Sequence, residues 1–342
     1  MTKKKKIIIS AVSVILVIAI AVGVSLGMLQ KEKKPDIQNS YDEIYTQENV
    51  SFDVSQDGEF SILKINDTHL INGTCKNDEN TLSDLKSILD KTPCDLIIVN
   101  GDLVDGYNAK ITYNKYKATA AFCELLESYD TPWTFAPGNN DGQQDGSNED
   151  LIAYMMQYPN FICGNEEGID GSMQFFIDLT QNGSTVHSIA VMDSLSLNNS
   201  GSYDYIKESQ INWLLDEIDA RKVKTSVFFH MPTPAFKTAY ENGVPYENFP
   251  FSDEYAVDDI KENQLFDSMT QDNEYITLIS TAHVHSDNIA YYYNNRYYQL
   301  SSLGGYNAAG SNNTKPSCTL TTINVNETDK QKMYTFEKIS AE

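Results

Sequence analysis

Short apolar runs alternate with amphipathic helical patterns over most of the chain after residue 59. The runs are rich in Val, Ile and Phe, a composition typical of buried strands. They predict strands at Phe60–Asn66, Leu96–Asn100, Trp133–Ala136, Val186–Met192, Thr225–Phe229, Tyr275–Ser280 and Arg296–Ser301. Between them, apolar residues three and four apart predict helices at Leu82–Asp90, Thr112–Ser128, Glu149–Tyr158, Glu208–Lys222 and Asp258–Met269. This order predicts an α/β fold, and Asn294-Asn295 predicts a hairpin turn.

Five of the predicted strands are followed by side chains that can bind metal ions. These side chains are Asp67 and His69, Asp102, Asn139, His230, and His283 with His285. Ligands of open α/β sheets bind beyond the carboxyl ends of the strands, so residues placed there converge in space. Four of the chain's five histidines are in this set. The fifth, His187, is interpreted as structural.

These seven side chains, with both nitrogen and oxygen donor atoms, are more ligands than one ion needs when it also keeps a water molecule. They fit two ions that share a bridging carboxylate, and Asp102 is the natural bridge. Such ligand shells accept Mn, Fe or Zn, so the identity of the two ions stays open.

The same residues resemble the signature of the calcineurin-like metallophosphoesterase superfamily. That signature runs D-x-H, G-D-x-x, G-N-H-[DE], a lone His and G-H-x-H. The chain has Asp67-Thr68-His69, Gly101-Asp102-Leu103-Val104, Gly138-Asn139-Asn140-Asp141, His230 and Ala282-His283-Val284-His285. The resemblance covers about Phe60 to Gly305, and it implies a two-sheet β-sandwich flanked by α-helices.

Two further fragments are similar to the branch related to purple acid phosphatases. They are Gln210–Leu214 and Phe229–Pro232. Purple acid phosphatases have a tyrosine ligand three residues after the bridging aspartate, where this chain has Asp105. The resemblance therefore does not imply the purple iron–tyrosinate chromophore.

The resemblance also implies how the ligands are shared. The first metal ion would take Asp67, His69, Asp102 and His285. The second would take Asp102, Asn139, His230 and His283.

Asn140 departs from the family pattern, which has a histidine that contacts the phosphate and helps to protonate the leaving oxygen. An asparagine donates a hydrogen bond but cannot transfer a proton. General acid catalysis contributes about 10²–10⁴-fold in rate, so its loss weakens turnover without abolishing it. We expect either that leaving groups needing no proton are favoured, or that Asp141 or Asp145 supplies one.

These features predict a two-metal phosphoester hydrolase, a phosphatase in which a metal-bridging hydroxide attacks phosphorus. Its partner would be a phosphorylated substrate. One alternative is a phosphodiesterase of nucleotide, lipid or cell-wall phosphodiesters. Another is a surface protein that binds the metal ions but has weak or lost catalysis because of Asn140.

The N-terminal segment predicts a membrane anchor. A basic tip at residues 1–6 precedes an uncharged apolar run at residues 7–29, which is long enough to span a bilayer. The lysine distribution favours a cytoplasmic N-terminus and an extracellular domain at residues 59–342, with residues 30–58 as a polar stalk. The alternative is secretion after cleavage near Ser25–Gly27. The net charge of −23 argues against binding to a nucleic-acid backbone.

Overall fold

The computed structural model describes residues 35, 37, 39–46, 50–106, 113–143, 146–198, 200–247, 249, 263–285, 288–301, 303–309 and 315–341. The predicted basic tip and membrane span, residues 1–6 and 7–29, lie outside these ranges, as does Asp145. Among the described residues, no helix combines the length and the apolar character needed to span a membrane.

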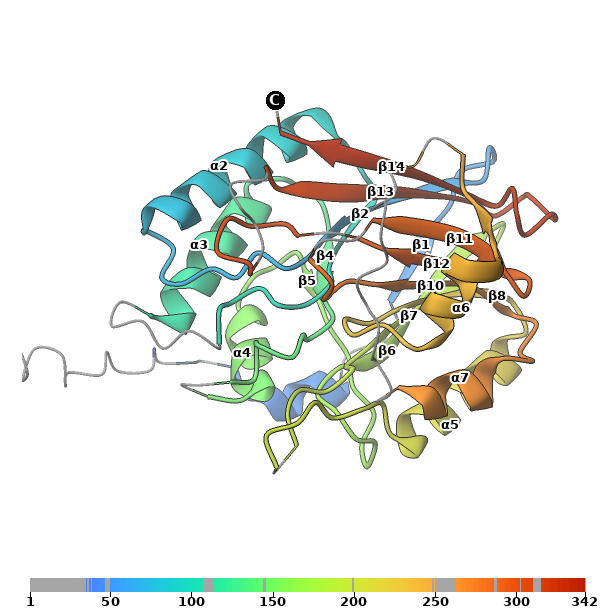
Figure 1. Cartoon of the computed structure of the whole chain (residues 1–342), viewed down its shortest axis with the longest axis horizontal. Helices are drawn as coiled ribbons and strands as arrows, with labels where there is room; N and C mark the ends of the chain where they lie inside the picture. The colour runs from blue at the N-terminus through green and yellow to red at the C-terminus, as the bar shows by residue number, and fades with distance from the viewer. Residues whose placement is uncertain are drawn as a thin grey trace, which may run out of the picture.

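Two β-sheets form the centre of the fold (Figure 1). Their strands are Val50–Asp53 (β1), Glu59–Ile65 (β2), Leu96–Val99 (β3), Trp133–Phe135 (β4), Phe161–Ile162 (β5), Gln174–Gln181 (β6), Ser184–Met192 (β7), Lys224–Phe228 (β8), Val244–Pro245 (β9), Ile276–Thr281 (β10), Ile289–Tyr293 (β11), Arg296–Leu300 (β12), Ser317–Asn324 (β13) and Tyr334–Ser340 (β14). One sheet has the order β1-β6-β7-β8-β10-β12-β11-β9, and the other has the order β14-β13-β2-β3-β4-β5.

In the six-stranded sheet, β2, β3 and β4 are parallel neighbours. All four residues of β3 are buried, as expected for a parallel strand that is covered on both faces. Because these strands point the same way, their carboxyl ends reach the same edge of the sheet.

The eight-stranded sheet contains a second parallel set, formed by β7, β8, β10 and β12. β11 returns antiparallel to β12 through Asn294 and Asn295, whose φ angles are 48° and 62°. Positive φ at both central residues is typical of a type I′ turn, so the predicted hairpin is confirmed.

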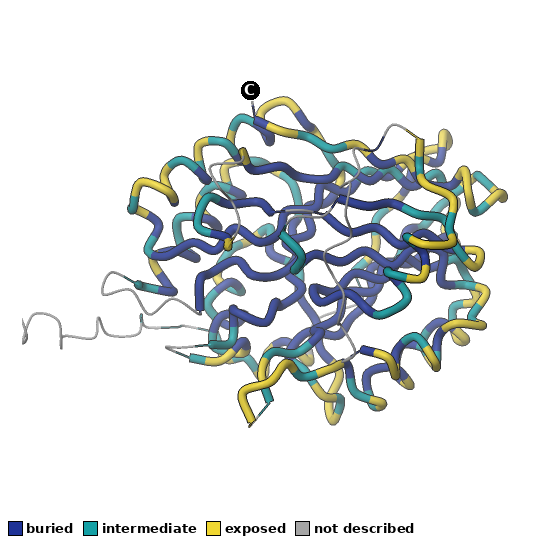
Figure 2. Tube along the Cα trace, in the orientation of Figure 1, coloured by how far each residue is buried: buried dark blue, intermediate teal, exposed yellow. Residues whose placement is uncertain are grey.

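Helices cover the outer faces of both sheets, which confirms the predicted two-sheet α/β architecture (Figure 1). They are Lys76–Lys91 (α2), Lys115–Glu127 (α3), Asn148–Met155 (α4), Glu208–Arg221 (α5), Ala235–Asn242 (α6) and Gln264–Thr270 (α7), with a 3₁₀ helix at Tyr41–Thr46 (η1). α2, α3 and α4 lie beside the six-stranded sheet, and α5, α6 and α7 lie beside the other. The strands at the centre are mostly buried, whereas exposed residues follow the outer helix faces and loop tips (Figure 2).

The predicted elements agree with the structure to within about two residues at most of their ends. α2 is an exception, because it begins at Lys76 rather than at Leu82. Its first turns are polar and lack apolar periodicity, although their acidic side chains suit a helix N-terminus. Five residues of the helix predicted from Asp258, residues 258–262, lie outside the described part of the chain.

Part of the predicted stalk belongs to the fold, so the boundary expected at residue 59 is too late. β1 pairs in parallel with β6, and the Ile44 side chain of η1 is buried, with only 1% of its surface exposed. The Tyr41 hydroxyl donates a hydrogen bond of 2.6 Å to the Ser172 carbonyl. The segment lacks the apolar periodicity of a helix or strand, which is why its sequence predicts a stalk, but its few apolar side chains pack on distant residues.

Candidate metal centre

The predicted ligands all follow strands whose carboxyl ends meet at one edge of the fold. Asp67 and His69 follow β2, Asp102 follows β3, Asn139 follows β4, His230 follows β8, and His283 and His285 follow β10. The first three strands belong to one sheet and the last two to the other. The candidate centre therefore joins the two sheets.

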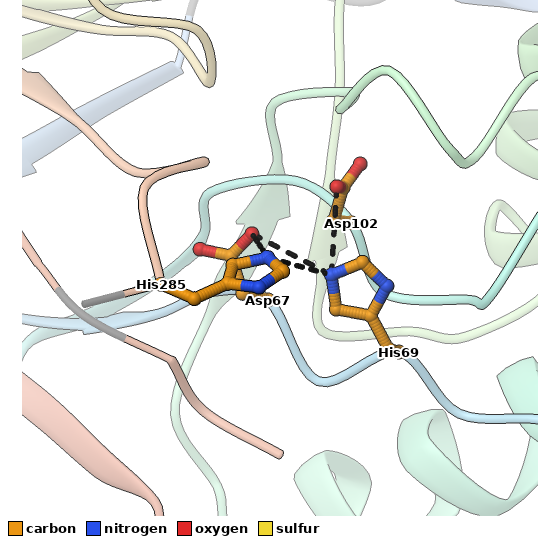
Figure 3. A group of neighbouring side chains, drawn as sticks. All are labelled: Asp67, His69, Asp102 and His285. Carbon is orange, nitrogen blue, oxygen red and sulfur yellow. Dashed lines mark hydrogen bonds and ion pairs between the residues drawn. The ribbon is translucent and has the colours of Figure 1, made fainter. Parts of the chain in front are cut away.

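The first group consists of Asp67, His69, Asp102 and His285 (Figure 3). One ligand atom from each lies within 4.8 Å of the others. The His285 Nε2 atom is 3.4 Å from the Asp67 Oδ1 atom. The His69 Nε2 atom is 3.7 Å from Asp67 Oδ1 and 3.6 Å from Asp102 Oδ2. These four side chains match the set predicted for the first metal ion.

The second group consists of Asp102, His230 and His283, whose ligand atoms also lie within 4.8 Å of one another. The His230 Nε2 atom is 3.3 Å from Asp102 Oδ2. Asp102 belongs to both groups, which is the position expected for a bridging ligand. The buried Asn139 side chain lines the same cavity as Asp102 and His283.

Within the described part of the chain, four buried atoms of the candidate ligands have no hydrogen-bond partner. They are Asp67 Oδ1, Asn139 Oδ1, His230 Nε2 and His283 Nδ1. Leaving buried polar atoms unsatisfied costs about 1–3 kcal/mol each, so native proteins rarely do so without a bound group. Cations fit these atoms, because all of them can be electron-pair donors.

Hydrogen bonds to the other ring nitrogen set the orientation of two of the histidines. His230 Nδ1 is 2.9 Å from the Asn100 carbonyl oxygen, and His285 Nδ1 is 2.7 Å from the Ala309 carbonyl oxygen. When Nδ1 donates to a carbonyl, Nε2 keeps a free electron pair for a metal ion. In both residues Nε2 is the atom that faces the aspartates.

The backbone around the candidate centre is strained. The φ angles of Asp67, His69, Asp102 and His283 are 51°, 46°, 51° and 73°, in the left-handed region that side chains other than glycine rarely adopt. Each such residue costs of the order of 1–3 kcal/mol, and strain of this kind clusters at functional sites.

The site's charges shift the pKa values of its groups in opposite directions. Burial alone would raise the pKa of Asp67, but its contacts with His285 and His69 hold it well below the usual range. Burial alone would lower the pKa of His230, but the adjacent Asp102 carboxylate raises it to about 9. Burial and the neighbouring His230 lower the pKa of His283 to about 4. The carboxylates therefore attract positive charge into this buried site.

Asn140 and Asp141 differ in what they contact. The Asn140 side-chain amide donates a hydrogen bond of 2.6 Å to Asp102 Oδ2, and Asn140 also lines the cavity. Asp141 is completely buried and does not line the cavity. Its carboxylate accepts hydrogen bonds from the backbone N–H groups of Asp102, Val104 and Gly138. This geometry argues against Asp141 as a proton donor to substrate and gives it a positioning role.

A cavity of about 650 Å³ opens onto both groups. Besides His69, Asp102, Asn139, Asn140, His283 and His285, it is lined by Asp105, Gln143, Leu197, Gly201, Ser202, Tyr203, Asn307 and Ala309. Leu197 and Tyr203 belong to no motif and lie in a loop between strand and helix patterns, so the sequence does not mark them as site residues.

His187 lies in β7, where its Nε2 atom is 2.9 Å from the Ser226 hydroxyl. It belongs to neither ligand group. This position agrees with the structural role predicted for it.

The fold and the strand-end residues define a protein of the metallophosphoesterase class, with side chains that could hold metal ions. A family model described as calcineurin-like phosphoesterase matches residues 60–287. Because the match covers most of the chain, the chain belongs to the calcineurin-like phosphoesterase family.

Two curated relatives come from Arabidopsis thaliana. The probable inactive purple acid phosphatase 14 is 29% identical over 193 residues, which are 46% of this chain and 46% of the relative. The probable inactive purple acid phosphatase 29 is 25% identical over 222 residues, which are 53% of this chain and 56% of the relative. The chain thus spans about half the length of the curated relatives it matches.

Among solved structures, a dimetal phosphatase from Danio rerio shares the fold. Its TM-score is 0.55 at 11% sequence identity, and the match covers 83% of this chain and 99% of that chain. At this identity the likeness concerns the fold alone.

Proposed function

We propose that this protein is a phosphatase that hydrolyses phosphoesters with two bound metal ions. The observation that carries the proposal is the pair of ligand groups that share Asp102. Asp67, His69, Asp102 and His285 would hold the first ion. Asp102, Asn139, His230 and His283 would hold the second.

Manganese, iron or zinc ions suit this mixture of imidazole, carboxylate and amide ligands. When bound, two such ions would activate a water molecule as the nucleophile and withdraw negative charge from the phosphoryl oxygens. The strained backbone and the histidine hydrogen bonds described above would hold the ligands in place before the ions bind.

Asn140 would assist without transferring a proton. Its amide lies at the cavity wall and donates to Asp102 Oδ2, so it orients the shared carboxylate and can offer its other N–H to a phosphoryl oxygen. Substrates whose leaving group needs no proton are therefore favoured, and aryl phosphates should react faster than alkyl phosphates.

Phosphodiester hydrolysis is the alternative reaction for the same centre, because the ligand set does not distinguish monoesters from diesters. A surface protein with weak or lost catalysis is the alternative from another class. Asn140 favours this second alternative, because it stands where the family has a proton-transferring histidine. The names of both curated relatives also contain the word inactive.

For the location of the domain we propose an anchored, extracellular position, with secretion after cleavage as the alternative. The sequence of residues 1–34 supports it through its apolar run and flanking lysines. In intact cells, a protease added outside should then degrade the domain. A domain that is protected in intact cells and degraded after lysis would contradict this location.

The proposed function is tested with the full chain in detergent, loaded with Mn²⁺, and with its Asp102→Asn variant. Metal content is measured by elemental analysis, and hydrolysis is measured with p-nitrophenyl phosphate and bis-p-nitrophenyl phosphate. We expect the wild type to bind two ions per chain and to show metal-dependent hydrolysis. Asp102→Asn should lose both the two-ion binding and the hydrolysis. The better substrate separates monoesterase from diesterase, whereas bound metal without turnover favours the binding protein.

A further inference from the structure

A hairpin whose described residues are 195–198 and 200–205 forms one wall of the cavity. Leu197 and Tyr203 pair across it through an antiparallel bridge, and both side chains line the cavity. Gly201 and Ser202 line it as well. The metal centre therefore faces a wall that carries two large apolar side chains.

These two side chains expose much of their surface. Leu197 is 41% exposed and Tyr203 is 43% exposed, whereas most large apolar side chains of the described residues are buried. Residues 200–203 of the hairpin are all exposed, so this segment lies at the surface. Exposed apolar area gains free energy when a ligand covers it, and apolar area in a cavity with polar groups is typical of a binding site.

Hydrogen bonds within the hairpin and to the neighbouring turn stabilise its shape. The Asn198 side-chain oxygen accepts from the backbone N–H groups of Ser200 and Ser202, at 2.9 and 3.2 Å. The Ser196 hydroxyl donates to the Asn139 carbonyl oxygen at 2.5 Å. This last bond connects the hairpin to the backbone of a candidate metal ligand.

The Tyr203 ring lies next to the candidate centre. Its centroid is 5.3 Å from that of the His283 ring, and the two planes are nearly perpendicular at 88°. A phosphoryl group at the metal centre would therefore carry its substituent within reach of this ring.

We propose that Tyr203 and Leu197 form a binding platform for a flat aromatic substituent of the substrate. The inference rests on the proposed function and names its substrate class, a phosphoester of an aromatic group. Two sources share this chemistry: an aryl ester, and a nucleotide whose base reaches the platform. Aromatic contacts of this kind typically improve binding by roughly 3- to 10-fold.

The test uses the full chain loaded with Mn²⁺ and three non-hydrolysable probes, namely methylphosphonate, phenylphosphonate and a nucleoside 5′-methylenephosphonate. Calorimetry should show phenylphosphonate binding roughly 3- to 10-fold more tightly than methylphosphonate. Tyr203→Ala should remove this preference, and Tyr203→Phe should keep it. Tighter binding of the nucleoside probe would identify the base as the aromatic group, whereas equal or weaker binding would identify an aryl ester.

Tyr205→Ala is the matched control. Tyr205 is 41% exposed and lies two residues after Tyr203 in the chain, but it does not line the cavity. The Lys207 ammonium lies over its ring, 3.8 Å from the ring centroid. We expect this variant to bind all probes as the wild type does. Because Tyr203 also contacts His283, metal content is measured for each variant. Leu197→Ala tests the same wall without removing that ring contact.

The outcomes separate the two proposals. Equal affinity for phenylphosphonate and methylphosphonate in the wild type, or an unchanged preference in both Tyr203→Ala and Leu197→Ala, would overturn the platform and leave the phosphoesterase intact. Failure of all three phosphonates to bind, together with no metal-dependent hydrolysis of p-nitrophenyl phosphate, would overturn the proposed function itself.

Discussion

Replacing Asp141 by alanine should destabilise the fold and weaken metal binding. Its carboxylate accepts the N–H of Asp102 at 2.8 Å, that of Gly138 at 2.8 Å and that of Val104 at 3.1 Å. These three bonds connect the turn after β3 to the turn after β4. Both turns carry candidate metal ligands, so the effect should reach the site through the backbone.

The size of the effect follows from two opposing contributions. Three buried N–H groups would lose their acceptor, at about 2 kcal/mol each, or roughly 6 kcal/mol together. Against this, burial and the nearby Asp102 raise the pKa of Asp141 to about 6, so removing the buried charge offsets part of this loss. We therefore expect the free energy of unfolding to fall by less than that sum, by about 3 kcal/mol.

Urea unfolding of the metal-free protein at pH 7.5 measures the change in stability, and titration with Mn²⁺ measures the change in affinity. Asp267→Ala is the matched control. Burial also raises the pKa of Asp267 to about 6, but this carboxylate accepts the backbone N–H of Ala235, at the start of α6. The control should lose less stability and bind Mn²⁺ as the wild type does.

A proton donor would give a different pattern. If Asp141 protonates the leaving group, Asp141→Ala would keep its stability and metal content. Its hydrolysis of alkyl phosphates would fall by about 10²-fold or more, while aryl phosphates, which need no proton, would react as before. That result would refute the positioning role derived from the three hydrogen bonds.

Two further changes test the packing of the site and of the core. In Gly138→Ala the new Cβ would lie 2.3 Å from the Asp102 nitrogen. The affinity for Mn²⁺, measured by calorimetry, should therefore fall about 10–100-fold. Gly142→Ala is the control, because its Cβ would come no closer than 3.0 Å to the Asn148 side chain, and it should bind Mn²⁺ as the wild type does. Burial and the nearby Lys224 lower the pKa of His187 to about 3. In the folded state this histidine therefore stays neutral, whereas in the unfolded state it takes up a proton below about pH 6.5. Between pH 8 and pH 5 the wild type should lose about 2 kcal/mol of stability through this residue, and His187→Gln should not. An equal pH dependence of urea unfolding in the two proteins would contradict it.

The positions of the candidate ligands could be predicted from the sequence because each one follows a strand. β3 shows why this works, since its apolar residues read as a strand and the next residues, Asn100 to Asp102, mark its end. Parallel strands bring such ends together whatever the exact bounds of the strands are. For that reason the two groups around Asp102 form as expected, although some helices, such as α2, begin at other residues than the pattern predicts.

The positions of β1 and η1 could not be predicted in the same way. Their apolar side chains, such as Ile44, are too few to form a pattern, and their partners lie more than a hundred residues away, as in the bond from Tyr41 to Ser172. Contacts of this kind depend on how the chain folds over long distances.

Sequence alone determined the α/β order of elements and the residue types at the strand ends, because both depend on local spacing. Only the tertiary structure decided what those residues contact. It turned the Asp141 carboxylate toward three backbone N–H groups, placed the Asn140 amide on Asp102, and brought Tyr203 beside His283. The physical reason is that a side chain's hydrogen bonds and burial depend on neighbours from distant strands and loops, which no local pattern records.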